Sequence, residues 1–160
     1  MDRSPHSSTL IGWREWVTLP DVGIPWIKAK VDTGARSSSL HAQHIHEFER
    51  EGAPWVRFDV RPWQGAHELV AVELPVFDRR DVRSSSGHAQ SRLVVLLDLM
   101  LVGHRVTAEV TLSNRSEMGF RMLIGREALR QGFTIDPARS FLGGKPPKPF
   151  RRLNRGHEGE

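Results

Sequence analysis

Short apolar stretches separated by turn-forming residues run through most of the chain. Seven of these stretches have the length of a β-strand, and many are rich in Val, Ile, Leu and Trp: residues 13–19, 26–31, 55–60, 68–76, 92–102, 105–112 and 120–124. Apolar runs of this length and composition between turn residues favour β-strands. The pattern therefore predicts an all-β protein.

Two short segments, 39–51 and 126–131, favour helix instead. Between the apolar runs 92–102 and 105–112, Gly103 and His104 predict a hairpin turn. The chain shows no repeat with a period of roughly 20 to 50 residues, which argues against a solenoid or a propeller. We expect one β domain over residues 11–142 with one short late helix, a flexible N-terminus at 1–10 and a flexible basic tail at 143–160.

The composition is that of a folded globular domain. Hydrophobic residues make up 38% and charged residues 26% of the 160 residues, which excludes a disordered chain. The net charge is +4, but residues 145–160 hold five Lys or Arg against two Glu, so +3 belongs to the tail and +1 to the rest. A nearly neutral body predicts no nucleic-acid partner.

Several function classes are excluded by residue types that the chain lacks. It has no Cys, so disulfide scaffolds, thiolate zinc sites and Cys nucleophiles do not apply. Residues 1–9 lack the apolar core of a signal peptide, and the longest near-apolar run, 93–102, is far shorter than the roughly 20 residues of a membrane helix. We expect a cytoplasmic protein with no membrane partner.

The most informative motif is Asp32-Thr33-Gly34-Ala35, which follows directly on the predicted strand 26–31. Thr hydrogen-bonds readily within a turn, and Gly lets the backbone approach closely. Such a loop presents a carboxylate on a rigid backbone, as a catalytic acid or base requires. The alternative is an Asx-type turn that does no more than end the strand.

A second motif, Ile124-Gly125-Arg126, follows a short apolar run and opens the predicted late helix. Together with the intervening hairpin, the two motifs resemble those of the retropepsin-like aspartic proteases. More narrowly, residues 13–17, 28–35, 78–88 and 114–129 resemble, in this order, the bacterial family usually labelled ATP-dependent zinc protease. The resemblance covers about residues 11–140. It implies a single retropepsin-like, acid-protease β-barrel domain, catalysis by Asp32, and association with an ATP-grasp ligase that adds glutamates to protein C-termini.

The carboxylate count then predicts a homodimer. Peptide hydrolysis by this route needs two Asp that share one proton, one acting as the general base toward water and the other polarising the scissile carbonyl. The chain has one Asp-Thr-Gly and no Asp-Ser-Gly. We therefore expect a second copy of the chain to supply the second Asp32 across a two-fold axis, with a peptide or protein as substrate.

The residues after the motif depart from the retroviral pattern. Arg36-Ser37-Ser38-Ser39 stands where those relatives have acidic residues, one of which pairs with the Arg of Ile-Gly-Arg. Arg36 and Arg126 would repel each other unless Glu127 or another acid lies between them. We predict that the active-site loop comprises Thr33, Gly34, Ala35 and Arg36 besides Asp32.

A second polar cluster, residues 78–88, is predicted to form the flap that closes over the substrate. Its small residues suit a lid that opens, and we assign to the flap Arg83, Ser84, Ser85, Ser86, Gly87 and His88. The alternative is a solvated loop whose charges pair locally.

Arginines near both predicted loops suggest an acidic, perhaps glutamate-extended, substrate. Arg36, Arg79, Arg80, Arg83 and Arg126 would be doubled in a dimer, and guanidinium groups bind carboxylates bidentately. The alternative is that they pair with Asp78, Asp81 and Glu127 and face solvent.

The family label implies zinc, but the residues predict no metal site and no cofactor. His41, His44 and His46 form H-x-x-H-x-H, which matches no common zinc motif, and no Walker loop is present, so ATP dependence would come from a partner. Two alternatives stay open. One is a metallopeptidase whose ligands are Asp32 and the dispersed His67, His88 and His104; the other is a non-catalytic module that regulates a peptide ligase.

Overall fold

The computed structural model describes residues 8–62, 69–83, 87–113 and 119–148. Strands dominate this part of the chain, together with one 3-10 turn and one short α-helix. In chain order the elements are β1 (Thr9–Gly12), β2 (Arg14–Leu19), η1 (Pro20–Val22), β3 (Ile24–Val31), β4 (Ser38–His41), β5 (Gln43–Arg50), β6 (Ala53–Val60), β7 (Val70–Pro75), β8 (Asp78–Arg83), β9 (Ala89–Leu101), β10 (His104–Ser113), β11 (Met122–Ile124), α1 (Arg126–Leu129) and β12 (Phe133–Asp136).

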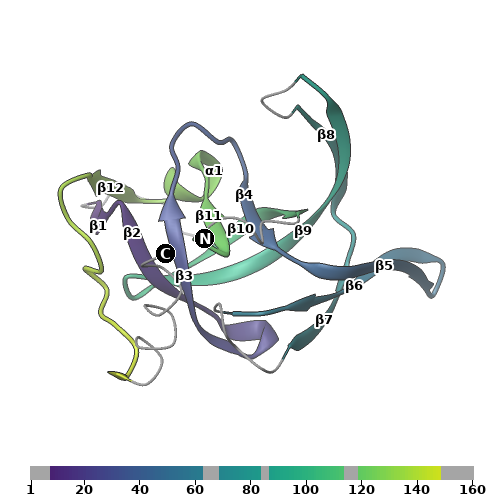
Figure 1. Cartoon of the computed structure of the whole chain (residues 1–160), viewed down its shortest axis with the longest axis horizontal. Helices are drawn as coiled ribbons and strands as arrows, with labels where there is room; N and C mark the ends of the chain where they lie inside the picture. The colour runs from purple at the N-terminus through teal and green to yellow at the C-terminus, as the bar shows by residue number, and fades with distance from the viewer. Residues whose placement is uncertain (1–7, 63–68, 84–86, 114–118, 149–160) are drawn as a thin grey trace.

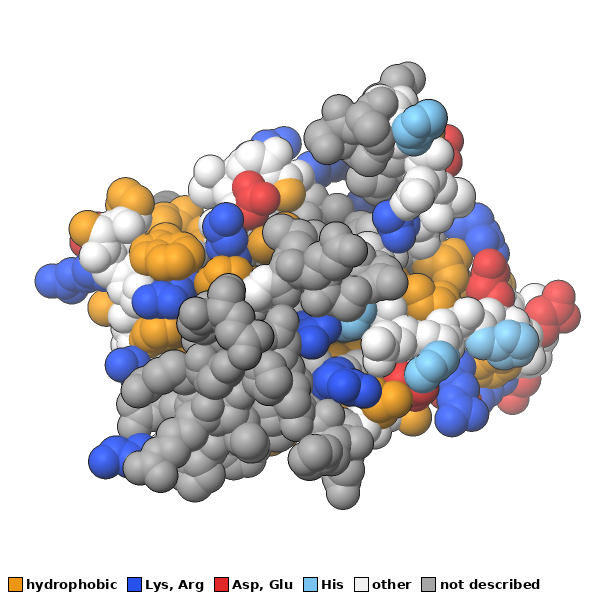
Figure 2. All heavy atoms as spheres, viewed as in Figure 1, with side chains coloured by type: hydrophobic (Ala, Val, Ile, Leu, Met, Phe, Trp, Pro, Cys, Tyr) orange, Lys and Arg blue, Asp and Glu red, His pale blue; other side chains and the backbone are white. Residues whose placement is uncertain are grey.

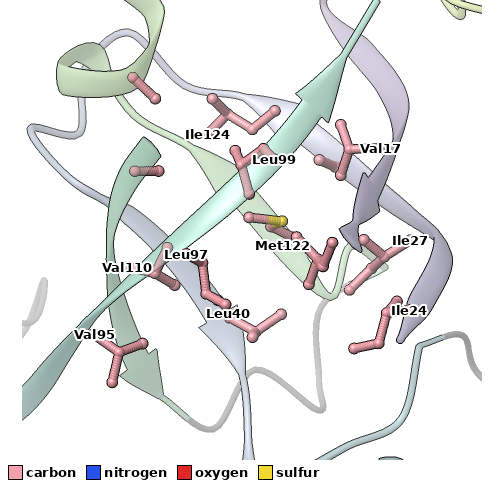
Figure 3. Packing of buried hydrophobic residues seen from close by; sticks show 14 of the residues in the cluster. Val17, Ile24, Ile27, Leu40, Val95, Leu97, Leu99, Val110, Met122 and Ile124 are labelled. Atoms are coloured by element: carbon pink, nitrogen blue, oxygen red, sulfur yellow. The ribbon is translucent and has the colours of Figure 1, made fainter. Parts of the chain in front are cut away.

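The main sheet closes into a barrel. Its strands are hydrogen-bonded in the order β10-β4-β11-β3-β2-β9, and pairing between β9 and β10 joins the two ends. Side chains alternate along a strand, so Val95, Leu97, Leu99 and Leu101 of β9 all face inward and are buried. Figure 3 shows Val95, Leu97 and Leu99 among apolar side chains of the other barrel strands in the interior. The predicted all-β fold is confirmed.

Two further sheets flank the barrel. Strands β5, β6 and β7 form an antiparallel sheet, which lies to the right in Figure 1. Strand β8 pairs only with β9, and the β8–β9 hairpin projects away from the barrel at the upper right of the same view. On the other side, β1 and β12 form a parallel pair that brings together two segments from near the two ends of the chain.

The shortest strand of the barrel has neighbours on both sides that come from distant parts of the sequence. β11 lies between β3, to which it is parallel, and β4, to which it is antiparallel. Met122 and Ile124 are fully buried in the core. Three residues of β11 thus complete the sheet beneath the loop that leaves β3.

The strand predictions from apolar runs are confirmed, since each of the seven runs contains a strand, and so is the short late helix. The prediction of a helix over 39–51 is wrong, because these residues form most of β4 and all of β5. Ser38–His41 gains hydrogen bonds from both β10 and β11, and this tertiary pairing outweighs local helix preference.

The β9–β10 turn is displaced by one residue from its predicted position. Val102 and Gly103 form it, with φ angles of 47° and 80°, and His104 already belongs to β10. A two-residue turn with positive φ at both positions matches the twist of the flanking strands. The N-terminal strand β1 begins at Thr9, inside the segment expected to be flexible.

A buried carboxylate fastens the C-terminal segment to the barrel. Glu15 of β2 is fully buried and accepts hydrogen bonds from the backbone N–H groups of Gly12, Leu142 and Gly143, at 2.7, 3.0 and 3.0 Å. These donors compensate the desolvation of the Glu15 side chain. In the part of the chain that the structure describes, no helix is long and apolar enough to cross a membrane.

The β11 core contact gives a stability prediction. We expect Met122→Ala to lower the free energy of unfolding by about 2–5 kcal/mol, because it leaves a cavity between β3 and β4. Leu96→Ala is the matched control: Leu96 is 42% exposed on β9, and its loss should cost less than about 0.5 kcal/mol. Denaturant titration of both variants measures the difference, and equal losses would contradict the assigned core position of β11.

Candidate active site

Asp32 lies at the end of β3, where the strand becomes a tight loop. Its backbone N–H donates to the carbonyl of Ile124 at 2.9 Å, which continues the β3–β11 pairing by one residue. Its side chain is half-buried, and Oδ1 accepts a hydrogen bond from the Gly34 N–H at 2.9 Å. A Cβ on Gly34 would lie 3.2 Å from this oxygen, so glycine here leaves the carboxylate room to bond within the loop.

The residues that follow β11 form hydrogen bonds with the backbone of the Asp32 loop. Arg126 N–H donates to the Ala35 carbonyl at 2.8 Å, and Glu127 N–H donates to the Arg36 carbonyl at 2.9 Å. Gly125 N–H donates to Oγ of Ser38 at 3.0 Å. A Cβ on Gly125 would lie 2.4 Å from the Ser37 carbonyl oxygen, so only glycine permits this close backbone approach.

The side chain of Arg126 also binds the loop. Its Nη1 donates to the carbonyls of Thr33 and Gly34, at 3.0 and 3.3 Å. The sequence suggests Glu127 as one acid between Arg126 and Arg36, and its Oε1 accepts the backbone N–H of Glu109 at 3.0 Å. Among the described residues, the guanidinium of Arg126 therefore meets backbone carbonyls and no carboxylate.

The predicted flap corresponds to the β8–β9 hairpin. Arg83 is opposite Ala89 in the register, so the connecting turn spans residues 84–88. Of these, Ser84, Ser85 and Ser86 lie outside the described residues, while Gly87 and His88 are exposed. In Figure 2 this hairpin stands out from the body at the upper right, with a hollow beside it.

Ion pairs fix the base of the hairpin. Arg79 of β8 forms a bidentate pair with Glu47 of β5, and Arg80 bonds to both Asp78 and Glu109. The hydrogen bond from Arg80 holds the pKa of Asp78 below its usual range, with smaller contributions from the Arg79 N–H and the charge of Arg36. This contact is present at neutral pH and is lost as the pH falls through the lowered pKa.

A polar cavity of about 620 Å³ separates the Asp32 loop from the hairpin. Its floor is the loop just after Asp32, and its other walls come from β8, β9, β10 and β11. The lining consists of residues 34–39, Arg80, Asp81, Arg92, Thr111, Ser113 and Leu123. Three guanidinium groups and five hydroxyl groups come from these residues, so the cavity offers hydrogen-bond donors to a polar or anionic side chain.

The structure separates the residues that sequence analysis grouped into one arginine rim. Arg36 and Arg80 line the cavity, whereas Arg79 is engaged with Glu47 and Arg126 with the loop carbonyls. The side chain of Arg83 lies outside the described residues. Arg92 of β9 was missed because it precedes no motif; its place at the cavity follows from its register opposite Arg80.

The histidines are dispersed. His41 is buried in β4, and His46 is exposed on β5. Nδ1 of His44 shares a 2.8 Å hydrogen bond with the carboxylate of Asp59. Among the described residues no three His, Asp or Glu side chains are grouped so that they could hold a metal ion. His67 lies outside those residues, and the zinc alternative gains no support from the rest.

Comparison with known proteins identifies the family. A family model described as "Retropepsin-like aspartic endopeptidase RimB" matches residues 10–146. The chain belongs to this RimB-like family. The match includes the Asp32 loop, the β8–β9 hairpin and β11 with α1, so the suspected retropepsin-like relationship is confirmed.

Individual relatives agree with this membership. A "Probable alpha-L-glutamate ligase" of Shewanella halifaxensis is 45% identical over 137 residues, which are 85% of this chain and 30% of that protein. A protein of the same name from Desulfotalea psychrophila is 46% identical over 130 residues, 81% of this chain and 28% of its own length. The RimB-like chain thus spans less than a third of these curated relatives.

A solved structure shares the fold over its whole length. Lpg0085 of Legionella pneumophila, a protein of unknown function, is 33% identical and superposes with a TM-score of 0.72. The match covers 86% of this chain and 99% of that one.

The Gly125 contact gives the second prediction. We expect Gly125→Ala to lower the free energy of unfolding by about 2 kcal/mol or more, because the added Cβ would overlap the Ser37 carbonyl and displace the Asp32 loop. Gly119→Ala is the control, since no atom lies within 4 Å of a Cβ built there. Chemical denaturation measures the free energy of unfolding of both variants. A Gly125→Ala variant as stable as the control would contradict the close approach of Gly125 to the Ser37 carbonyl.

Proposed function

We propose that this RimB-like chain is an aspartic-type peptidase in which a homodimer brings two Asp32 side chains together. The observation that carries the proposal is the placement of the Asp32 carboxylate. Its Oδ1 accepts a hydrogen bond from Gly34, and the residues that follow β11 bind the backbone of its loop. The loop lies next to the cavity that separates it from the β8–β9 hairpin. Asp81, which belongs to the hairpin, is the one acid among the described residues that lines that cavity, and Asp32 lies on the loop beside it. We assign the second carboxylate to a second chain, because this chain has a single Asp-Thr-Gly motif.

The chemistry follows from two carboxyl groups that share one proton. The ionised Asp32 takes a proton from a water molecule as the water oxygen bonds to the scissile carbonyl carbon. The partner's Asp32 donates its proton to the carbonyl oxygen, which gives a neutral tetrahedral diol. As the C–N bond breaks, one hydroxyl of the diol returns its proton to the partner's Asp32 and becomes the new carbonyl, while the leaving nitrogen takes the proton that the first Asp32 had accepted, which restores both carboxyl groups to their starting states. Activity should fall at both low and high pH, because only the singly protonated pair is competent.

The cavity favours substrates that carry carboxylates. Arg36, Arg80 and Arg92 contribute three positive charges to its lining against the single charge of Asp81 among the described residues. Arg80 is committed to Asp78 and Glu109, so Arg36 and Arg92 are the groups that we assign to substrate. Seryl hydroxyls from residues 37–39 supply further donors. We propose an acidic or glutamate-rich peptide as the substrate.

The relatives named as probable glutamate ligases bear on the partner. Their matching region is less than a third of each, so they contain much that this chain does not. We propose that the chain works alongside an ATP-grasp ligase, and that it hydrolyses glutamate-bearing peptides of the kind such an enzyme produces. The ligase would account for any ATP dependence, while hydrolysis by Asp32 needs neither ATP nor metal.

Asp32→Asn tests the mechanism. We expect peptide hydrolysis to fall by at least about 1,000-fold, because the amide cannot act as the base, while the thermal midpoint stays within about 2 °C of the wild type. Mixing equal amounts of the two chains, with time for subunit exchange, should reduce the wild-type activity to about half, since a mixed dimer lacks one carboxylate. Unchanged activity in the mixture would rule out a shared site.

Arg92→Gln tests the substrate class. We expect kcat/KM for a glutamate-rich peptide to fall about ten-fold, with little change for the same peptide containing glutamine, because one charge-assisted contact is lost. Arg57→Gln is the matched control, since Arg57 is exposed on β6 away from the cavity. Equal effects on both peptides would reject the acidic-substrate proposal and leave the Asp32 mechanism standing.

A further inference from the structure

Two arginines away from the Asp32 loop have no ion-pair partner in the part of the chain that the structure describes. Arg61 follows β6 and Arg121 precedes β11, and both side chains are half-buried. The Nε atom of each is enclosed and has no hydrogen-bond partner among the described residues. No acid in that part of the chain forms an ion pair with either, unlike the ion-paired Arg79, Arg80 and Arg105.

Strand pairing brings the two residues together. His41 N–H donates to the Arg121 carbonyl at 2.7 Å. The pairing of Gln43 with Asp59, continued by two residues, places Arg61 opposite the same His41. In agreement with this placement, burial lowers the pKa of Arg121, and the like charge of Arg61 lowers it further. An arginine stays protonated at any physiological pH, so both charges persist. Half-buried cations that repel each other are unfavourable for folding, and an anion between them would remove the repulsion.

The pair is distinct from the proposed catalytic cavity. β11 and β3 run parallel, and Met122 pairs with Ala29. Arg121 is therefore level with Lys28, which precedes Asp32 by four residues. Four residues of a strand span about 13 Å. Neither Arg61 nor Arg121 lines the cavity beneath the hairpin.

We infer that Arg61 and Arg121 form a second, oxyanion-binding site, which takes a carboxylate or a phosphate group between the two guanidinium forks. Each fork presents several donors in one plane, which matches the paired oxygens of either group. Neutralisation by the ligand relieves the repulsion between the two side chains.

The experiment follows the Nε–Hε resonances of the full-length chain labelled with ¹⁵N-arginine. Inorganic phosphate is titrated in one arm and glutarate in the other, with sodium chloride at equal ionic strength as the reference. We expect saturable shifts of the Arg61 and Arg121 signals in at least one arm, and none for Arg57. Saturation by phosphate alone identifies a phosphate site, and saturation by glutarate alone identifies a carboxylate site.

Arg61→Gln is the decisive variant. We expect the Arg121 signal to lose its saturable response, or to need about ten-fold more ligand, while the thermal midpoint without anion does not fall, because the repulsion has been removed. Arg57→Gln should bind as the wild type does. Absence of a saturable shift in both arms up to about 50 mM, or shifts equal to those in chloride, would overturn the inference.

The readout uses no hydrolysis, so the result is independent of the proposed peptidase activity. The Asp32→Asn chain should bind the anion as the wild type does. Should Arg61→Gln fail to fold, the titration of the wild-type chain still decides, and Arg121→Gln observed at the Arg61 signal gives the reciprocal test.

Discussion

The rest of the structure depends on the insertion of β11 between β3 and β4. Three residues of this strand complete the barrel, and the residues immediately after them bind the loop that carries Asp32. Both roles need the backbone at Gly125 to pass the Ser37 carbonyl at a distance that excludes a Cβ. The closure of the barrel and the position of the Asp32 carboxylate therefore both depend on one short pairing. The paired segments lie some ninety positions apart in the sequence, as do Arg126 and Thr33, which are in contact.

Regular alternation made the barrel predictable from the sequence, whereas non-local pairing decided what was missed. Leu97, Leu99 and Leu101 alternate with less buried neighbours, so the strand signal of β9 is local. Segment 38–41 becomes β4 because Ser38 pairs with Val110 and Leu40 with Met122, partners that no local pattern reveals. The Asp32 loop was predictable because its motif is continuous in sequence. The second carboxylate is a requirement of the proposed mechanism, because the chain has a single Asp-Thr-Gly motif.

Positive charge is used in three physically different ways. At the hairpin base, Arg79 and Arg80 are neutralised by carboxylates and act as fasteners between β8 and its neighbours. Arg126 donates hydrogen bonds to the carbonyls of the Asp32 loop and so holds the backbone of that loop in place. Its charge has no carboxylate partner among the described residues. Arg36 and Arg92 face a cavity. Sequence composition counts these arginines alike, and only their partners distinguish structural cations from those that remain to bind a ligand.

The hydrogen bonds of the Asp32 loop fix the orientation of its carboxylate within the single chain. The carbonyls of Thr33, Gly34, Ala35 and Arg36 all have donors within the same chain. Oδ1 of Asp32 is oriented by the Gly34 N–H, and its Oδ2 accepts no hydrogen bond from the described residues. In the dimer that we propose, the loop would not need to reorganise when a second carboxyl group and a water molecule approach Oδ2, because folding already fixes its orientation. A rigid loop with one bonded and one available oxygen is the arrangement that the proposed shared proton requires.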